Sequence, residues 1–476
     1  MRFDNFSYVE NTMTVEERIK DRRISIVGMA RSGVAAALLA DHFSGIPFVS
    51  DVKKPALLTA QIKQLKDMKI PFETNGHTER LLQCDYMIVS PGVPLSIDII
   101  IKAREKGIPV FSEIEFASWV CKGKIIAVTG SNGKTTTTSL LGELFTAGGY
   151  DTYIGGNIGL PFSEFALKVP SNGVAIIEVS NFQLETIADF SPDTALILNL
   201  TPDHLDRYDS FDDYKKAKYR ITENQTVQQS LILNYDDSEI TGDTISTKAQ
   251  VYYFTTTDSS QTHTFVRDEK LYCRKKNQEV AVINCSEILI PGPHNLQNAV
   301  AAASAAILYG IPPETIRKVL HAFPGVEHRM ENAGKVAGIS FINDSKATNV
   351  DSVCFALRSV DTKLYLIAGG RDKGADFTPI IQYGKNKIKG VIAIGEAKEK
   401  IINTFGQAFP VQFADSLEDA VKKMFETAIP GETILLSPGC ASFDMFENFE
   451  HRGKVFKEAV ANLRKGKNEN EALSKK

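Results

Sequence analysis

The sequence predicts an α/β protein of three domains, each built on a mainly parallel sheet. Short apolar runs rich in β-branched residues alternate with longer helical stretches, the pattern of parallel strands joined by covering helices. Several of these runs end in a glycine turn, so that the strand–turn–helix unit restarts three times along the chain. A chain of 476 residues has room for about three domains of roughly 150 residues each. We expect the domains to be 1–119, 120–325 and 326–476.

The expected strands are short runs of Ile, Val, Leu and Ala. In chain order they are 24–27, 86–89, 125–128, 174–177, 195–198, 339–342, 365–368, 391–394 and 434–436. Helices are expected at 135–145, which the glycine-rich loop opens, at the alanine-rich run 299–308, and at 313–320. Residues 248–283 differ, because their short Tyr, Phe and Val runs predict an antiparallel insertion.

Composition excludes several classes of function. The chain has 54 Lys and Arg against 58 Asp and Glu, so its net charge of −4 gives no basic surface for nucleic acid. No apolar run approaches the roughly 18 residues of a membrane-spanning helix, so membrane insertion is not expected. The first residues lack the apolar core of a secretory signal, and the six cysteines form no CxxC pair, as in reduced cytoplasmic proteins. We expect a cytoplasmic monomer.

The clearest motif is a glycine-rich loop at 129–136, with the sequence TGSNGKTT. It follows the buried strand 125–128 and opens a helix, as phosphate-binding loops do. Glycines let consecutive backbone N–H groups point at phosphate oxygens, while Lys134 would bridge the outer phosphates and Thr135 would offer a hydroxyl to Mg²⁺. The alternative is a plain glycine turn with an exposed lysine. The order of strand, loop and helix favours binding of a nucleoside triphosphate.

Acidic and imidazole side chains follow two other strands of the same expected sheet. Glu178 ends the run 174–177, and His204 lies between two aspartates after the run 195–198. The carboxyl ends of parallel strands meet at one sheet edge, so both side chains are expected beside the glycine loop, where they suit divalent metal ions. An exposed strand-end carboxylate and a structural histidine are the alternatives.

Three further polar segments need an interpretation. The lysine-rich segment 214–220 predicts, from its chemistry alone, a solvated basic helix face. Asn295 and Asn298 head an alanine-rich helix; their amides suit an adenine edge, but Asn295 serves equally well as a helix cap. The polar loop 343–349 follows an expected strand in the third domain, at the edge where ligands bind in such sheets.

The N-terminal domain carries an incomplete dinucleotide fingerprint. The strand 24–27 is followed by GMARSG at 28–33, and Asp51 ends the next strand, where an acid could meet a ribose. Ala30 replaces the glycine that lets the backbone approach a pyrophosphate, so a nicotinamide cofactor is weakly supported. A nucleotide-sugar diphosphate would use the same geometry, with 90–94 as another wall. A purely structural turn is the alternative.

Taken together, these segments resemble the Mur ligase family, over nearly the whole chain from residue 24 to 456. The matching segments are the ATP loop at 129–136, the substrate loop GGNIG at 155–159, EVSNFQLE at 178–185, DHLDRY at 203–208 and SPGCASFDMFENFEHRG at 437–453. The last three are similar to the D-glutamate-adding branch of the family. Asn181 departs from that branch, which has a second serine there. The resemblance implies a Rossmann-like N-terminal domain, a central P-loop domain with an ATP-binding parallel sheet, and a Rossmann-like C-terminal domain.

The resemblance implies a role for each matching residue. ATP would be bound by Gly130, Ser131, Asn132, Gly133, Lys134, Thr135, Thr136, Asn295, Asn298, His328, Arg329 and Asp344. The UDP-sugar would be bound by Ser32, Asp51, Ser90, Gly92, Asn157 and Ser180, and D-glutamate by Thr348, Lys373, Ser442 and Phe449. Two Mg²⁺ ions would be held by Thr135, Glu178, His204 and a carbamylated Lys218. Lys134, His204, Lys218 and Lys346 would be catalytic.

The implied activity is an ATP-dependent ligase that adds D-glutamate to UDP-N-acetylmuramoyl-L-alanine through an acyl phosphate, in peptidoglycan synthesis. Closure of the third domain would complete such a site. One alternative is a related ligase that adds another amino acid. A second, of a different class, is a P-loop kinase or regulatory ATPase with a nicotinamide-sensing first domain.

Overall fold

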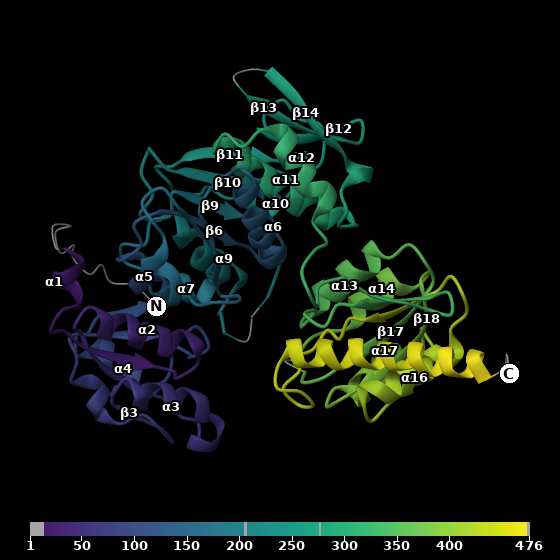
Figure 1. The fold of residues 1–476 in the computed structure, drawn as a ribbon, viewed down its shortest axis with the longest axis horizontal. Helices are drawn as coiled ribbons and strands as arrows, with labels where there is room; N and C mark the ends of the chain where they lie inside the picture. The colour runs from purple at the N-terminus through teal and green to yellow at the C-terminus, as the bar shows by residue number, and fades with distance from the viewer. Residues whose placement is uncertain (1–13, 204–206, 276–277, 373, 474–476) are drawn as a thin grey trace. The chain divides into compact units, whose positions relative to one another are not determined.

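The computed structural model describes residues 14–203, 207–275, 278–372 and 374–473. The chain forms two compact units, one of Met1–Val282 with Val300–Val319 and the other of Ile283–Ala299 with Leu320–Lys476. The first unit contains two sheets and the second contains one (Figure 1). The three sheets confirm the predicted α/β class, while the domain limits at 119 and 325 stay predictions.

The first sheet has five parallel strands in the order β3-β2-β1-β4-β5. Its strands are β1 (Arg23–Val27), β2 (Ile46–Ser50), β3 (Phe72–Glu73), β4 (Tyr86–Val89) and β5 (Val110–Ser112). The helices around it are α1 (Val15–Ile19), α2 (Arg31–His42), α3 (Thr59–Asp67), α4 (Asp98–Glu105) and α5 (Glu113–Ser118). The strand order reverses between β1 and β4, the point at which such sheets bind ligands.

The second sheet has nine strands in the order β14-β13-β12-β11-β10-β9-β6-β8-β7. They are β6 (Lys124–Thr129), β7 (Thr152–Gly156), β8 (Val174–Glu178), β9 (Thr194–Ile197), β10 (Ser230–Asn234), β11 (Gln250–Phe254), β12 (Thr264–Arg267), β13 (Lys270–Lys275) and β14 (Gln278–Asn284). Its helices are α6 (Lys134–Ala147), α7 (Phe162–Phe165), α8 (Asn181–Leu184), α9 (Phe211–Tyr219), α10 (Ser238–Gly242), α11 (Pro293–Leu308) and α12 (Pro313–Ala322). Strand β6 lies between β8 and β9, parallel to both, so the loops after these three strands share one edge.

The predicted antiparallel insertion at 248–283 is only partly right. β12 and β13 do form an antiparallel hairpin, but β11 pairs parallel to β10 along its full length. β11 also meets β12 in parallel, at Phe254 and Thr264. Short runs of Tyr, Phe and Val fit either pairing, so the pattern could not give the strand direction.

The third sheet has six strands in the order β15-β16-β20-β17-β18-β19. They are β15 (Glu331–Val336), β16 (Ile339–Asn343), β17 (Leu364–Gly369), β18 (Ile388–Ile394), β19 (Val411–Phe413) and β20 (Thr433–Leu436), and only β15 pairs antiparallel. Helices α13 (Val350–Ser359), α14 (Thr378–Gly384) and α15 (Lys398–Phe405) cover one face, and α16 (Leu417–Thr427) and α17 (Phe449–Leu473) cover the other (Figure 1). Because β20 lies between β16 and β17, the loops after these three strands are neighbours.

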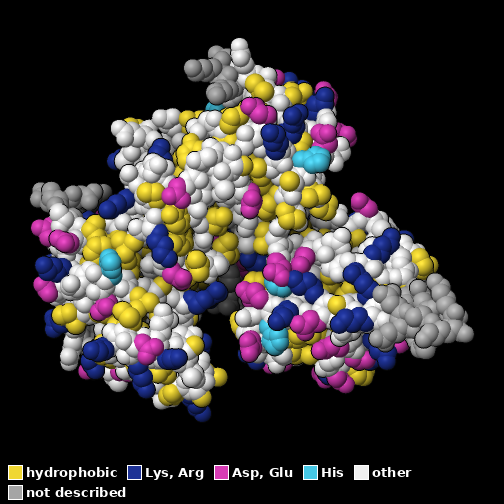
Figure 2. Space-filling model, in the orientation of Figure 1, with side chains coloured by type: hydrophobic (Ala, Val, Ile, Leu, Met, Phe, Trp, Pro, Cys, Tyr) yellow, Lys and Arg dark blue, Asp and Glu magenta, His cyan; other side chains and the backbone are white. Residues whose placement is uncertain are grey.

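On the face drawn in Figure 2, basic and acidic side chains are interspersed over both units, in keeping with the small net charge. Within the described ranges, no helix is both long and apolar enough to cross a membrane.

A buried glutamate makes stability depend on pH. Glu113, at the start of α5, is fully buried; its Oε1 accepts a hydrogen bond from the Ser163 N–H at 2.6 Å, while Oε2 has no partner among the described residues. Burial raises the pKa of Glu113 from 4.5 to about 7. Between these values the folded chain holds more protons than the unfolded chain, so stability falls as pH rises through this window.

We therefore expect Glu113→Gln to stabilise the protein at pH 8 by up to about 3 kcal/mol, because the amide stays neutral. The gain should be much smaller at pH 5, where the wild-type carboxyl is mostly protonated in the folded state. Urea unfolding at both pH values measures the difference, with the exposed Glu105→Gln as the control. An equal gain at both pH values would show that ionisation of Glu113 is not the cause.

Candidate active site

The glycine loop between β6 and α6 has the geometry of a phosphate site. Gly130 and Gly133 have φ values of +145° and +85°, and a Cβ at Gly130 would lie 3.1 Å from the Cβ of Leu198. α6 begins at Lys134 after Gly133, which has no side chain to cap the helix. The N–H groups of the first helical turn and the helix dipole therefore favour an anion at this position.

A residue after β9 holds this loop in place. The Asn199 Oδ1 accepts a hydrogen bond from the Asn132 N–H at 2.8 Å, and its Nδ2 donates to the Asn132 carbonyl at 3.0 Å. The Ser131 N–H donates to the Asn199 carbonyl at 2.9 Å. The loop conformation is thus fixed by the neighbouring strand as well as by its own glycines.

Carboxylate and hydroxyl oxygens meet beside the loop. The Thr135 Oγ1 donates to the Glu178 Oε2 at 2.7 Å, and the Asn157 Nδ2 donates to the Glu178 Oε1 at 3.1 Å. Glu178 ends β8 and is 2% exposed, so it is not the solvated strand-end carboxylate of the alternative interpretation. A hydroxyl and a carboxylate at one strand edge are oxygen ligands of the kind that Mg²⁺ prefers. The residues fit a magnesium ion next to a bound triphosphate.

Lys218 on α9 lies under the same loop. It is 1% exposed, and its Nζ donates to the Gly130 carbonyl at 3.1 Å. The Lys134 Nζ donates to the same carbonyl oxygen at 2.8 Å. Burial, and next the charge of Lys134, lower the pKa of Lys218 well below its usual value. The amine of Lys218 is therefore much more readily neutral than that of an ordinary lysine.

The expectation of a solvated basic helix at 214–220 is wrong for two of its lysines. Lys215 is 8% exposed and forms ion pairs with Asp212, Glu239 and Asp243 at 3.1–3.2 Å. Lys218 is buried on the loop side of α9, and only Lys216 is exposed. Lys215 contacts Glu239 and Asp243, and Lys218 contacts the Gly130 carbonyl. These partners lie outside the segment, so its local composition does not reveal them.

Loops after β1, β2 and β4 meet at one edge of the first sheet. A Cβ at Gly33 would lie 1.8 Å from the Gly28 carbonyl oxygen, so only glycine fits there. The Asp51 Oδ2 accepts from the Met29 N–H at 2.7 Å, and the Ser90 Oγ donates to the Gly28 carbonyl at 3.1 Å. Asp51 and Ser90 thus shape the turn at 28–33.

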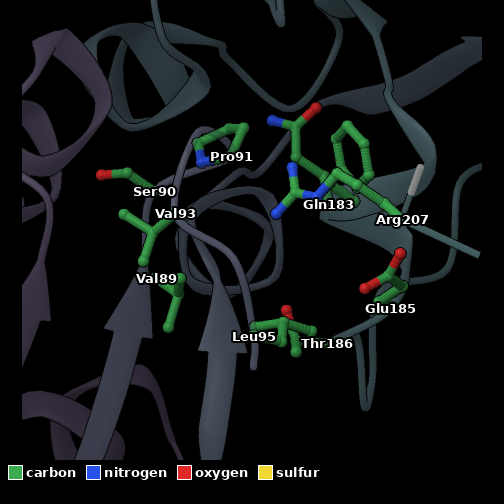
Figure 3. A pocket seen from close by; sticks show the side chains of 10 residues that line it. Val89, Ser90, Pro91, Val93, Leu95, Gln183, Glu185, Thr186 and Arg207 are labelled. Carbon is green, nitrogen blue, oxygen red and sulfur yellow. The ribbon is translucent and has the colours of Figure 1, made fainter. Parts of the chain in front are cut away.

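Figure 3 shows a small pocket between this edge and the segment that follows β8. It is lined by Val89, Ser90, Pro91, Val93, Leu95, Phe182, Gln183, Glu185, Thr186 and Arg207. The Gln183 Oε1 accepts from the N–H and the hydroxyl of Ser180, both at 3.0 Å, but its buried Nε2 has no partner among the described residues. The Arg207 guanidinium lies over the Phe182 ring, 4.1 Å from its centroid. A buried amide without an acceptor is costly, which points to an acceptor supplied by a ligand.

In the second unit, the predicted amides lie in the first turns of α11. Asn295 is the third residue of this helix, not its cap, and its Nδ2 donates to the Pro291 carbonyl at 2.8 Å. The Asn298 Nδ2 donates to the Asn295 Oδ1 at 3.3 Å. The two amides therefore form a connected pair, and the capping alternative is wrong.

The loops after β16 and β20 meet at the edge of the third sheet. Asp344 is 1% exposed; its Oδ2 accepts from the Ser437 hydroxyl at 2.9 Å and its Oδ1 from the Met330 N–H at 3.2 Å. Burial raises the pKa of Asp344 to about 6. The Lys346 Nζ lies 5.4 Å from the centroid of the Phe449 ring. This contact joins the loop after β16 to the start of α17.

His328 lies in a polar cluster at the same edge. It is 6% exposed with a φ of +64°, and its Nδ1 is 3.0 Å from the Asn343 Nδ2. Glu331 also accepts from the Asn343 Nδ2, at 2.9 Å, and Lys457 pairs with Glu331 at 3.0 Å. This arrangement fixes the backbone immediately before Arg329.

The sequence matches models of all three domains of one family. The MurD N-terminal domain matches residues 23–97, the Mur ligase middle domain 128–306, and the Mur ligase glutamate ligase domain 328–440. A relative from Thermoanaerobacter sp. (strain X514), named UDP-N-acetylmuramoylalanine--D-glutamate ligase, is 40% identical over 94% of this chain and 100% of its own length. A relative of the same name from Chloroherpeton thalassium is 44% identical over 95% of this chain and 100% of its own. This chain belongs to the Mur ligase family.

Solved Mur ligase structures share the fold. The UDP-N-acetylmuramate-alanine ligase MurC of Thermotoga maritima matches with a TM-score of 0.60 and 18% identity, over 93% of this chain and 99% of its own. The pseudomurein peptide ligase type C of Methanothermus fervidus matches with a TM-score of 0.58 and 18% identity, over 93% of this chain and 100% of its own. These similarities confirm the predicted architecture of a Mur ligase with three domains.

The structure of this Mur ligase gathers the predicted residues at three sheet edges. In the first unit, Lys134, Thr135, Glu178 and Lys218 lie together at the second sheet, and Asp51 and Ser90 contact the turn that precedes Ser32 at the first sheet. In the second unit, Lys346 and Phe449 are neighbours, and Ser442 is buried in the adjacent loop. Two predicted residues, His204 and Lys373, lie outside the described residues.

Sequence patterns missed three residues of these edges. Asn199 hydrogen-bonds to the phosphate loop, and Gln183 has a buried amide beside the pocket. The Tyr214 hydroxyl lies 2.8 Å from the Ser131 Oγ, within hydrogen-bond distance. Only Gln183 left a local signal, because Ser180 and Gln183 have the spacing of a capping box, and they form one. The other two contacts join segments far apart in the chain.

Proposed function

We propose that this Mur ligase joins D-glutamate to UDP-N-acetylmuramoyl-L-alanine with conversion of ATP to ADP and phosphate. The observation that carries the proposal is the match to relatives of that name, 40% and 44% identical, over their full length. Thr135 and Glu178 beside the phosphate loop support ATP and Mg²⁺ as its partners. The reaction is a step of peptidoglycan synthesis, and so of cell wall formation. We place it in the cytoplasm, with the chain as a monomer.

The chemistry requires activation of a carboxylate, which is a poor electrophile. In the proposed reaction the alanine carboxylate attacks the γ-phosphorus of ATP, releasing ADP and forming an acyl phosphate. The amine of D-glutamate then attacks the acyl carbon, and phosphate leaves as the amide forms. Phosphoryl transfer depends mainly on positioning and neutralisation of charge.

The residues of the phosphate loop would do this positioning. The half-buried amine of Lys134 donates to the carbonyls of Gly130 and Ser131 at 2.8 and 2.9 Å. From this position in the loop it would turn toward the outer phosphates. Thr135 and Glu178 would hold one Mg²⁺, which supplies further charge neutralisation when bound. We assign Lys346 to the γ-phosphate, and Asn295, Asn298, His328, Arg329 and Asp344 to the rest of the nucleotide site.

We propose that Lys218 carries a carbamate, which would serve a second Mg²⁺ together with His204. Carbon dioxide adds to a neutral amine with loss of a proton, so a lysine with a strongly lowered pKa is the reactive kind. The product is an anion, which suits the neighbourhood of Lys134 better than a second ammonium group does. Burial against Gly130 would also shield the carbamate from water.

The remaining residues are assigned by substrate. The UDP-sugar would contact Ser32, Asp51, Ser90, Gly92, Asn157 and Ser180. The Gln183 Nε2, which has no acceptor among the described residues, supports adding Gln183 to this set. D-Glutamate would contact Thr348, Lys373, Ser442 and Phe449. The domains 1–119, 120–325 and 326–476 would present the UDP-sugar, ATP and D-glutamate, respectively.

One assay tests the proposal. ATP hydrolysis by the purified chain should require UDP-N-acetylmuramoyl-L-alanine and D-glutamate together, and should be negligible with either alone. Replacing D-glutamate with L-alanine, meso-diaminopimelate or L-glutamate should abolish the reaction. Hydrolysis without the muramoyl nucleotide, or hydrolysis modulated by NAD, would instead support a kinase or a regulatory ATPase.

A further inference from the structure

Arg452, near the start of α17, is a fully buried charge at the edge of the third sheet. It is 0% exposed. Its Nε donates to the Ser345 Oγ at 3.0 Å and its Nη2 to the Ser345 carbonyl at 2.7 Å. Both Nη1 and Nη2 donate to the Cys440 carbonyl at 3.1 Å. The guanidinium is thus held by a hydroxyl and two carbonyl oxygens.

These hydrogen bonds join loops that follow two different strands, and the guanidinium lies beside a third loop. Ser345 follows β16 and Cys440 follows β20, while a Cβ at Gly370, after β17, would lie 3.2 Å from the Arg452 Nη1. Lys346 is next to Ser345 in the first loop, and Ser442 is two residues beyond Cys440 in the second. One side chain on α17 therefore fixes the distance between two loops that carry proposed site residues.

A contribution to folding stability does not by itself explain why an arginine is buried at this position. Burying an ion against neutral acceptors costs free energy, and an apolar side chain of similar size often folds as well or better. A guanidinium, however, has five N–H donors in one rigid plane, which a lysine ammonium does not. The rigid plane lets one side chain hold two backbone segments in a defined orientation.

We propose that Arg452 is a positioning residue, which sets the spacing of the loops after β16 and β20 so that D-glutamate meets Thr348 and Ser442 together. This inference rests on the proposed function of those loops. Arg452 itself contacts no substrate, because its guanidinium is enclosed by the protein.

The test compares Arg452→Lys and Arg452→Met with Arg464→Met, which removes an exposed arginine from the same helix. For both Arg452 variants, KM for D-glutamate should rise by about tenfold or more, since small displacements of binding groups have large effects. KM for UDP-N-acetylmuramoyl-L-alanine should change by less than about twofold, because the first unit is untouched. Arg464→Met should behave as the wild type does.

Two further measurements separate positioning from simple loss of folding. In Arg452→Ala, methylguanidine should lower KM for D-glutamate again, because it can refill the vacated site, whereas methylammonium should not. Ser345→Ala keeps the arginine but removes the hydroxyl that accepts from the Arg452 Nε and donates to the Phe449 carbonyl at 2.8 Å. It should also raise KM for D-glutamate, but by less than the Arg452 variants do. If the Arg452 variants do not fold, Ser345→Ala decides the question.

Unchanged constants in the folded variants, or equal changes of KM for both substrates, would overturn the inference. So would a Ser345→Ala enzyme with wild-type constants when the Arg452 variants cannot be obtained. Failure of the proposed function would look different, because the wild-type enzyme would then turn over ATP repeatedly with neither D-glutamate nor another amine nucleophile present.

Discussion

Lys134→Ala should lower ligase activity by about 10³-fold or more, because the loop loses the cation that neutralises the transferred phosphoryl group. The acyl phosphate should no longer form. Hydroxylamine, which traps acyl phosphates as hydroxamates, measures this step directly when D-glutamate is omitted. The fold should survive, since the Lys134 side chain is only half-buried and its amine contacts loop carbonyls rather than apolar core side chains.

Lys168→Ala is the matched control for this variant, because Lys168 is an exposed lysine that follows α7 in the same unit. The Lys168→Ala enzyme should keep the wild-type ligase activity and should form the hydroxamate at the wild-type rate. Lys134→Ala should keep the wild-type circular dichroism and melting temperature. A Lys134→Ala enzyme that still yielded the hydroxamate at the wild-type rate would remove Lys134 from the mechanism.

The second large effect is expected at Lys218. Lys218→Ala should lower activity by about 10²–10³-fold, as loss of a preorganised charged group does. If the active form is a carbamate, acetate or propionate should restore part of the activity, because a small carboxylate can occupy the position of the lost anion. Methylammonium should restore none, since it resembles the unmodified lysine.

Lys216→Ala supplies the control, as Lys216 is the exposed lysine of the same helix. It should be fully active and insensitive to acetate. The intact mass of wild-type protein kept in bicarbonate should exceed the unmodified mass by one carbon dioxide, and this excess should be absent in Lys218→Ala. Rescue by the amine instead of the carboxylate would show that Lys218 acts as a cation.

The sequence predicted which residues lie at the strand ends of each sheet. It did not predict the contacts that join segments far apart in the chain. Strand β6, its glycine loop and α6 form a continuous local pattern, and neighbouring parallel strands end at one edge, so the meeting of Thr135 and Glu178 was expected. In the third sheet, the polar loop after β16 was expected at a ligand edge for the same reason.

Contacts between distant segments were not predictable in this way. Lys215 and Lys218 looked solvated because their partners lie in other elements of the fold. Arg452 bonds to Ser345, 107 residues away, and nothing near it in the chain indicates burial. The direction of β11 likewise depends on its pairing with β10, which alternation of side chains does not specify.

The amide of Gln183 has a consequence for inhibitor chemistry. Its Nε2 is a buried donor beside a small, partly apolar pocket, and it carries no charge. A neutral acceptor such as a sulfone or lactam oxygen could take this hydrogen bond without the desolvation that a phosphate mimic requires. A fragment anchored there would be flanked by the Phe182 ring and the Arg207 guanidinium stacked on it. If the pocket belongs to the proposed UDP-sugar site, such a fragment would compete with that substrate and would avoid the phosphate loop, which resembles those of many unrelated ATPases.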